Sequence, residues 1–296
     1  MTELPEIRDD EPLARHTTIG TGGTARHYAE PASVSQLQAV LAHAEASAWP
    51  VEVIGLGSNL LVHDDGVDAL VLRLVGELAS VTIDGKTMVA GGGATNAVCL
   101  HRARDAGLGG FEFAAAIPGT AGGGVRMNAG AYGSDWSEIT RSVLVVDARG
   151  THELGVGDLG LSYRHSGLIP GQVVAEVRYE LIPRDPSVIR ASASALLAKR
   201  KASQPTNKRT FGSVFKNPSP DLGAGQAIEA CGLKGYVIGG AVISPVHANF
   251  IENVANATTA DAVALMAEAR RRVYERYGIV LKHEVRFLGP IVLPAL

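Results

Sequence analysis

Apolar residues recur at helical spacing in three long stretches of the chain. These stretches predict helices over residues 33–48, 189–202 and 259–278. Ser33 is a candidate N-cap for the first helix, and a threonine cap and Gly278 bound the third. The chain therefore contains well-bounded helices beside its strands.

Shorter apolar runs, separated by turns that contain glycine, predict strands. Residues 49–74 hold two such runs around a tight GLGSN turn, and with the preceding helix they predict a β-α-β unit. Hairpins are expected near residues 84–85 and 149–150, and a last strand over residues 279–293. The GLGSN turn lacks the third glycine of a dinucleotide-binding fingerprint and no helix follows it, so a Rossmann site is disfavoured.

Two changes in this pattern divide the chain. From about Leu78 the β-α-β pattern gives way to hairpins and glycine clusters, and Pro183 and Pro186 mark a second boundary. The 296 residues exceed the size at which one hydrophobic core usually stops growing. We therefore expect three domains, residues 1–77, 78–184 and 185–285, with a terminal strand at 286–296 joining the first.

The composition is that of an ordinary globular protein, with 46% hydrophobic and 19% charged residues. A net charge of −3 offers no footprint for nucleic acid or an anionic membrane. We see no signal peptide, no apolar run long enough to span a membrane, and no metal-ligand spacing among the nine histidines. Cys99 and Cys231 lie in apolar surroundings without a CxxC motif, which indicates two buried thiols in a reducing cytoplasm.

The most unusual stretch is residues 117–133, which read IPGTAGGGVRMNAGAYG. Glycine at this density destabilises the fold unless the backbone needs positive φ or close approach to another group. N–H groups turned toward one concavity could form a nest for an anionic ligand. The alternative is a tight structural turn, because Ile117, Val125 and Met127 indicate packed structure rather than a linker.

Two loops carry candidate chemistry. Arg164 lies in the YRHS loop at 163–166, where its fixed charge suits a carboxylate, although solvated arginines are common. The segment 212–218, GSVFKNP, gathers the Ser213 hydroxyl beside the Lys216 ammonium. Ser213 could deliver a proton if nearby charge assists it, or its segment could form an ordinary turn.

Glu284 is the third candidate, because it interrupts an otherwise apolar terminal strand. Such a carboxylate must face water or find a cationic partner, and Arg286 lies two residues on. A structural ion pair and a catalytic carboxylate both remain open. The run at 270–272, three consecutive arginines, is interpreted as a solvated helix face or an interaction site.

Taken in order, six segments resemble those of UDP-N-acetylenolpyruvoylglucosamine reductases, over almost the full length. They are GLGSNLLV (55–62), GFEFAAAIPGTAGGGVRMNAGAYG (110–133), YRHS (163–166), GSVFKNP (212–218), AGQAIEACGLKG (224–235) and HEVRFLG (283–289). The resemblance implies an α+β fold with a two-domain FAD-binding part of the vanillyl-alcohol oxidase type and a C-terminal α+β domain for the UDP-sugar. It implies non-covalent FAD, NADPH as hydride donor, and reduction of UDP-N-acetylglucosamine enolpyruvate to UDP-N-acetylmuramate for peptidoglycan synthesis. We expect a cytoplasmic monomer.

The resemblance also assigns site residues. Its catalytic residues correspond to Arg164, Ser213 and Glu284. Its flavin contacts correspond to Gly57, Ser58, Asn59 and the backbone of Pro118, Gly119, Thr120, Gly122, Gly123 and Ala129. Its contacts to the substrate's carboxylate or diphosphate correspond to Lys216, Asn217 and Arg286.

Two departures from the family pattern are visible. Lys282 stands where relatives usually have another glutamate, which changes the charge around Glu284. The chain also lacks the inserted segment that contributes a tyrosine over the UDP-sugar, so it resembles the shorter form. Two alternatives stay open: an FAD-dependent sugar or alcohol oxidase of the same fold, and a non-catalytic nucleotide-sugar-binding relative.

Overall fold

The structure is a computed structural model that describes residues 3–296. Contacts between Cα atoms divide the chain into two compact units, each assembled from separate segments. Unit 1 comprises residues 1–9, 27–56 and 69–199, and unit 2 comprises residues 10–26, 57–68 and 200–296. The predicted division into residues 1–77, 78–184 and 185–285 has other bounds and stays a prediction.

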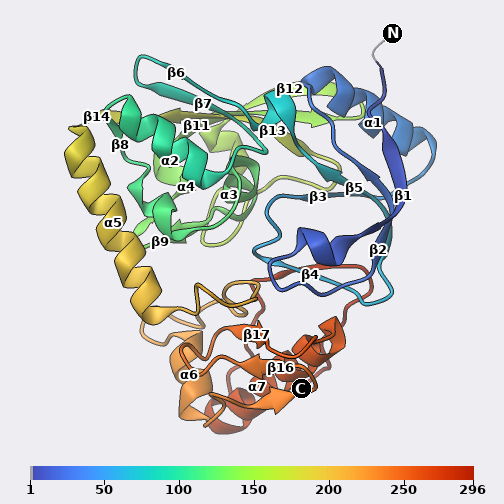
Figure 1. Ribbon diagram of the computed structural model, residues 1–296, viewed down its shortest axis with the longest axis vertical. Coiled ribbons are helices and arrows are strands. Elements are labelled where there is room, and N and C mark those ends of the chain that lie inside the picture. The colour runs from blue at the N-terminus through green and yellow to red at the C-terminus, as the bar shows by residue number, and fades with distance from the viewer. Residues whose placement is uncertain (1–2) are drawn as a thin grey trace. The chain divides into compact units, whose positions relative to one another are not determined.

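Unit 1 is dominated by an antiparallel sheet (Figure 1). Its strand order is β12 (Gly150–Gly155), β11 (Thr140–Asp147), β13 (Val173–Glu180), β7 (Thr87–Gly91) and β6 (Val81–Asp84). A second sheet has the order β1 (Ile7–Pro12), β2 (Thr24–Ala29), β5 (Val67–Arg73) and β3 (Val51–Ile54), and the unit boundary falls within β1, β2 and β5. The two-stranded pairs are β8 (Leu108–Gly109) with β14 (Ile182–Pro183), and β9 (Gly130–Ala131) with β10 (Ser134–Asp135).

Helices cover both faces of the five-stranded sheet. They are α1 (Val34–Ala46), α2 (Asn96–Asp105), α3 (Ala121–Met127) and α4 (Trp136–Ile139), and α5 (Pro186–Ser203) starts in this unit. Along β11, Val143 and Val145 join the core beneath α2 and α3, whereas Leu144 and Val146 pack toward α1. Alternate residues of a strand face opposite sides, so the continuous apolar run of β11 reflects burial of both its faces.

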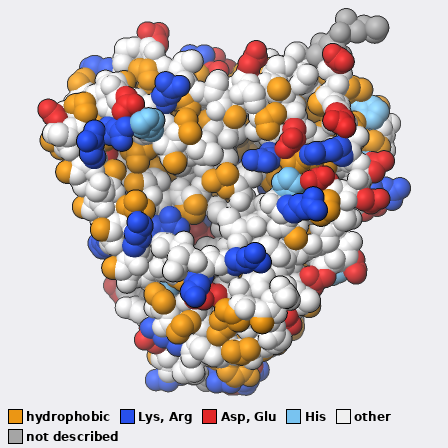
Figure 2. Space-filling view, in the orientation of Figure 1, with side chains coloured by type: hydrophobic (Ala, Val, Ile, Leu, Met, Phe, Trp, Pro, Cys, Tyr) orange, Lys and Arg blue, Asp and Glu red, His pale blue; other side chains and the backbone are white. Residues whose placement is uncertain are grey.

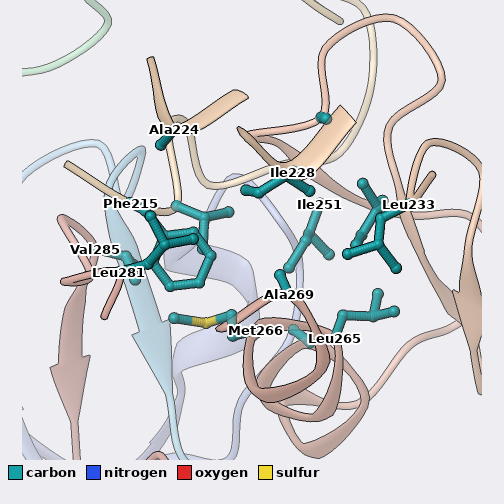
Figure 3. Close-up of a cluster of buried hydrophobic side chains, with 14 of the residues drawn as sticks. Phe215, Ala224, Ile228, Leu233, Ile251, Leu265, Met266, Ala269, Leu281 and Val285 are labelled. Carbon is teal, nitrogen blue, oxygen red and sulfur yellow. The ribbon is translucent and has the colours of Figure 1, made fainter. Parts of the chain in front are cut away.

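Unit 2 contains two small sheets and two helices. The parallel pair is β4 (Leu60–Val62) with β18 (Arg286–Leu288), and the antiparallel sheet has the order β15 (Val237–Ile238), β16 (Ala241–Ile243) and β17 (Ile251–Asn253). The helices are α6 (Ala224–Ala230) and α7 (Thr259–Tyr277). Figure 3 shows their shared core, where Phe215, Leu281 and Val285 lie beside one another. The chain also has 3-10 helices η1 (Leu13–His16), η2 (Gly76–Ala79), η3 (Glu112–Ala116) and η4 (Val156–Leu159).

The three long helices are confirmed, each within three residues of its predicted ends. The Ser33 hydroxyl accepts from the N–H of Gln36, as an N-cap does, and Gly278 ends α7 with a positive φ of 66°. Both hairpins form, because β6 pairs with β7 and β11 with β12. In the region of the predicted β-α-β unit, α1 connects β2 to β3, and β5 lies between these two strands in the sheet.

Two expectations were wrong. The strand expected over residues 279–293 is regular only at 286–288, because the preceding residues bond to loops rather than to a strand ladder. Cys99 is buried, and burial raises the pKa of its thiol to about 12, but Cys231 is only half-buried; both are free thiols.

Acidic and basic side chains are intermixed over the face drawn in Figure 2.

Candidate active site

The glycine-rich stretch 117–133 contains a short helix, α3, which the sequence did not predict. Thr120 caps it, with its hydroxyl accepting from the N–H of Gly123 at 3.4 Å. The N–H groups of the first two helical residues donate to carbonyls of the turn at 92–94, at 2.8 and 2.9 Å. The N–H groups of Ala121 and Gly122 are therefore already bonded within the protein, and these two groups do not form the anion-binding nest that the sequence suggested.

Packing within unit 1 explains two of these glycines. A Cβ on Gly124 would lie 2.3 Å from the ring of Trp136, and one on Gly122 would lie 2.9 Å from the carbonyl oxygen of Gly92. Real Cβ atoms do not approach other atoms so closely, so neither position has room for a side chain.

Packing does not explain Gly119 and Gly123. A Cβ on Gly123 would meet only the Thr120 hydroxyl, at 3.3 Å, and one on Gly119 only the Asn96 amide nitrogen, at 3.4 Å. Gly123 is exposed, and glycine costs about 1 kcal/mol relative to alanine inside a helix. Bare backbone at these two positions suits the close approach of a bound group such as a flavin nucleotide.

Arg164 lies in a tight turn next to this stretch. Ser162 and His165 exchange main-chain hydrogen bonds of 3.1 and 3.0 Å, and Arg164 between them adopts a left-handed φ of 53°. Its Nη2 donates to the carbonyl of Gly130 at 2.7 Å, and its guanidinium lies 5.1 Å from the ring centre of Tyr163. The cation is therefore held at the end of the glycine-rich stretch.

Two residues that the sequence analysis did not single out attach this turn to α3. The buried Ser166 hydroxyl donates to the carbonyl of Arg126 at 2.7 Å. The buried Asn128, with φ of 37°, donates from Nδ2 to the carbonyl of Ser162 at 3.0 Å and accepts at Oδ1 from the N–H of Ser137. Asparagine directly after a helix favours the αL conformation, but the sequence analysis did not predict α3, so this signal was not available for Asn128.

In unit 2 the structure brings Ser213 and Glu284 into neighbouring segments. The N–H of Glu284 donates to the carbonyl of Val214 at 2.8 Å, and the N–H of Lys216 donates to the carbonyl of Lys282 at 2.9 Å. Residues 214–216 and 282–284 thus run antiparallel, and both Ser213 and Glu284 are half-buried. Main-chain bonds therefore place the segment after Ser213 beside the segment that carries Glu284.

Residues of the GLGSN turn join this arrangement from the other side. Asn59 donates from Nδ2 to the carbonyl of Glu284 at 3.2 Å, and its own carbonyl accepts from the N–H of Arg286 at 3.1 Å. Gly57 has a φ of 63°, and a Cβ there would lie 2.0 Å from the carbonyl oxygen of His16. The fold itself therefore requires glycine at position 57.

The residues expected to face the substrate have mixed surroundings. Asn217 is exposed, and its Oδ1 accepts from the N–H of Ala224 at the start of α6, at 3.1 Å. Lys216 and Arg286 are half-buried. Asn217 therefore has a structural bond through its oxygen whatever it contacts through its nitrogen.

Comparisons with known proteins identify the family. A model of the UDP-N-acetylenolpyruvoylglucosamine reductase C-terminal domain matches residues 204–288, and an FAD binding domain model matches residues 25–154. A reductase of this name from Symbiobacterium thermophilum is 44% identical over 285 residues, covering 96% of this chain and 92% of the relative. The chain belongs to the UDP-N-acetylenolpyruvoylglucosamine reductase family.

Further relatives agree with that assignment. The reductase from Rubrobacter xylanophilus is 42% identical over 294 residues, covering 97% of this chain and 96% of the relative. The crystal structure of the Thermus caldophilus reductase superposes with a TM-score of 0.83 at 34% identity, covering 96% of this chain and 99% of that one. The α+β fold with an FAD-binding part and the C-terminal domain of the reductase family is confirmed, as is the resemblance itself.

No helix among residues 3–296 combines the length and the apolar character needed to cross a membrane. In the same described residues, no group of three or more His, Cys, Asp or Glu side chains could hold a metal ion.

Proposed function

We propose that this protein carries out the NADPH-dependent, FAD-mediated reduction of UDP-N-acetylglucosamine enolpyruvate to UDP-N-acetylmuramate, a step of peptidoglycan precursor synthesis. Family membership supports the reaction. The observation that carries it on this chain is the main-chain bond from Glu284 to Val214, which sets a carboxyl group and the Ser213 hydroxyl on adjacent segments. A reduction that ends in protonation of carbon needs a proton donor, and the Ser213 hydroxyl can supply that proton.

The proposed roles follow from the chemistry of each side chain. When bound, FAD supplies the hydride chemistry, which no amino-acid side chain can provide. Arg164 binds the substrate carboxylate and stabilises the negative charge that develops beside it, as a preorganised cation does. Ser213 donates a proton to the substrate carbon, and Glu284, if protonated, donates a hydrogen bond to the developing enolate.

The cofactor and substrate contacts are proposals as well. Bare backbone at Gly119 and Gly123 supports approach of FAD to the segment 118–129, and no His or Cys occurs within 117–133 to tether it, which favours non-covalent binding. We propose Ser58 and Asn59 of the GLGSN turn as further FAD-binding residues. Lys216, Asn217 and Arg286 would bind the diphosphate or carboxylate of the UDP-sugar, since cations and amides suit such oxygens.

Three coarser expectations belong to the same proposal. Residues 1–77 and 78–184 form the two FAD-binding subdomains, residues 185–285 bind the substrate, and residues 286–296 join the first subdomain through β18. The pairing of β18 with β4 supports the last point. We propose a cytoplasmic monomer.

The first experiment is anaerobic spectroscopy of the purified protein. NADPH should bleach the flavin absorbance near about 450 nm, and UDP-N-acetylglucosamine enolpyruvate should restore it. Recovery only on admission of oxygen would refute the proposed reaction and support an oxidase. Failure of NADPH to bleach a bound flavin would support a non-catalytic relative.

A second experiment addresses Ser213. Ser213→Ala should leave reduction of the flavin by NADPH nearly intact and slow its reoxidation by the enolpyruvyl sugar. Equal slowing of both half-reactions would show a structural defect and contradict the proton-donor role.

A further inference from the structure

Asn249 is a buried polar residue in an apolar part of unit 2, between β16 and β17. It is 4% exposed and stands between the buried Ala248 and Phe250. Three of its hydrogen bonds go to the segment that follows Ser213. Its carbonyl accepts from the N–H of Val214 at 2.9 Å, its Oδ1 accepts from the N–H of Phe215 at 2.9 Å, and its Nδ2 donates to the carbonyl of Phe215 at 2.8 Å.

These bonds complete a three-segment arrangement. On one side, residues 214–216 pair through their main chain with residues 282–284. On the other side the main chain of Asn249 supplies only one bond, and its side-chain amide supplies the other two in place of a strand. Asparagine is suited to this role because its amide carries a carbonyl acceptor and an N–H donor on a short stem, as a peptide group does.

The asparagine is itself held in place. Its N–H donates to Nδ1 of His247 at 3.2 Å, and the His247 ring packs edge-on against Phe250, with ring centres 5.1 Å apart. Burial lowers the pKa of His247, which favours the neutral imidazole and keeps Nδ1 available as an acceptor. Asn249 is therefore held at its own N–H by His247 and at its side-chain amide by Phe215.

We propose that Asn249 is the positioning residue for Ser213: its side-chain amide fixes the main chain of residues 214–215 and so holds the Ser213 hydroxyl next to the segment that carries Glu284. Asn249 acts through the backbone and donates no proton itself. The inference rests on the proposed function of Ser213. It adds a residue that the sequence analysis did not consider.

Removing the amide has a defined consequence. In Asn249→Ala, the N–H and the carbonyl of Phe215, a residue 2% exposed, lose their partners, so the segment must shift to find others. Displacement of a reacting group by about 1 Å can cost about 100-fold in rate. We expect reoxidation of the reduced flavin by the enolpyruvyl sugar to slow by about 10- to 100-fold, with the KM for the sugar and the rate of reduction by NADPH little changed.

A double-mutant cycle separates positioning from general destabilisation. The rate of reoxidation is measured for the wild type, Ser213→Ala, Asn249→Ala and the double variant. If Asn249 acts through Ser213, the double variant is no slower than Ser213→Ala alone. If the two losses multiply, or if Asn249→Ala reoxidises at the wild-type rate, the inference is overturned.

Asn253 provides the matched control four residues away. Its side chain also makes two hydrogen bonds to main chain, donating to the carbonyl of Ile19 at 3.0 Å and accepting from the N–H of Ala257 at 2.9 Å. Asn253→Ala should lower thermal stability and leave the rate of reoxidation unchanged. Slowing as large as that in Asn249→Ala would show that loss of any such side-chain amide suffices, and would contradict positioning.

A second variant covers the case in which Asn249→Ala does not fold. Asn249→Leu keeps the branched shape of the side chain and loses both bonds to Phe215, so reoxidation should slow while the visible spectrum of bound FAD is preserved. Reoxidation at the wild-type rate in this variant would overturn the inference. If Ser213→Ala reoxidises at the wild-type rate, Ser213 is not the proton donor and the proposed function of this residue is wrong. If Ser213→Ala is slow but the Asn249 variants are not, Ser213 keeps its proposed role and only the inference about Asn249 is wrong.

Discussion

Gly124→Ala and Gly123→Ala, at adjacent positions of α3, should change stability in opposite directions. A Cβ on Gly124 would lie 2.3 Å from Cε2 and 2.6 Å from Cζ2 of Trp136, where ordinary carbon contacts are about 3.5–4.0 Å. Trp136 cannot easily retreat. It is fully buried, its Nε1 donates to Tyr179 at 2.9 Å, and it packs edge-on against Phe111 and Phe113.

The magnitude for Gly124→Ala follows from these contacts. Overpacking a core costs about 1–3 kcal/mol, and disturbing the hydrogen bond from Trp136 to Tyr179 costs about 1 kcal/mol more. Replacing glycine by alanine in a helix returns about 1 kcal/mol. We expect a net loss of about 2 kcal/mol in the free energy of unfolding, and a fall of about 4–8 °C in Tm.

Gly123→Ala is the matched control, because its Cβ would meet only the Thr120 hydroxyl at 3.3 Å. The cofactor-free protein should gain up to about 1 kcal/mol from helix propensity, whereas the affinity for FAD should fall if the flavin approaches this backbone. Tm of the apoprotein and FAD titration by fluorescence quenching measure the two effects separately. A Gly124→Ala protein that melts at or above the wild-type temperature would refute the packing argument, and unchanged FAD affinity in Gly123→Ala would refute close approach there.

Three further predictions concern unit 2. Hydrogen bonds from Arg271 and Arg272 hold the pKa of Glu268 at about 2, below its ordinary 4.5. The ion pairs therefore stabilise α7 above pH 4.5, and this stabilisation is lost as the pH falls from 4.5 toward 2. Glu268→Gln should lower the free energy of unfolding by about 1 kcal/mol at pH 7 and leave it unchanged near pH 2, as measured by urea denaturation. Burial lowers the pKa of His247, so the unfolded chain binds more protons than the folded chain, and the free energy of unfolding falls as the pH drops below about 6.5. His247→Gln should reduce the slope of the free energy of unfolding against pH between about pH 7 and 5. A slope equal to that of the wild type would contradict this prediction. Asp64 accepts from the first two N–H groups of α7, both at 2.8 Å, so Asp64→Ala should lower the free energy of unfolding by about 1–2 kcal/mol, and a change below the error of the measurement would show that water replaces the cap.

Much of the local structure was predictable from the sequence. Helical periodicity and caps located α1, α5 and α7 closely, because helix formation depends on residues three and four apart and on the terminal turns. Turn residues located the two hairpins for the same reason. The family motifs also supplied candidate site residues, although the geometry of that site lay beyond local patterns.

The helix inside the glycine-rich stretch was missed because three glycines lower the intrinsic helix propensity of α3. Tertiary packing overrides that propensity: Gly124 packs against the ring of Trp136, and the N–H groups of Ala121 and Gly122 bond to the turn before α2. The terminal strand was overextended for the converse reason. Its apolar residues, Leu281 and Val285, serve the core of unit 2 rather than a strand ladder.

The sequence by itself determined the family and the fold class, and it identified Arg164, Ser213 and Glu284 as candidate catalytic residues. Motifs and periodicity depend on residues close together in the chain, so they can be recognised without the structure. Only the tertiary structure decided what holds them. Asn249 meets the segment after Ser213 from 34 residues away, and Glu284 meets it from farther along the chain still. Hydrogen bonds between such distant residues depend on the folded path of the backbone, which no local pattern of side chains specifies.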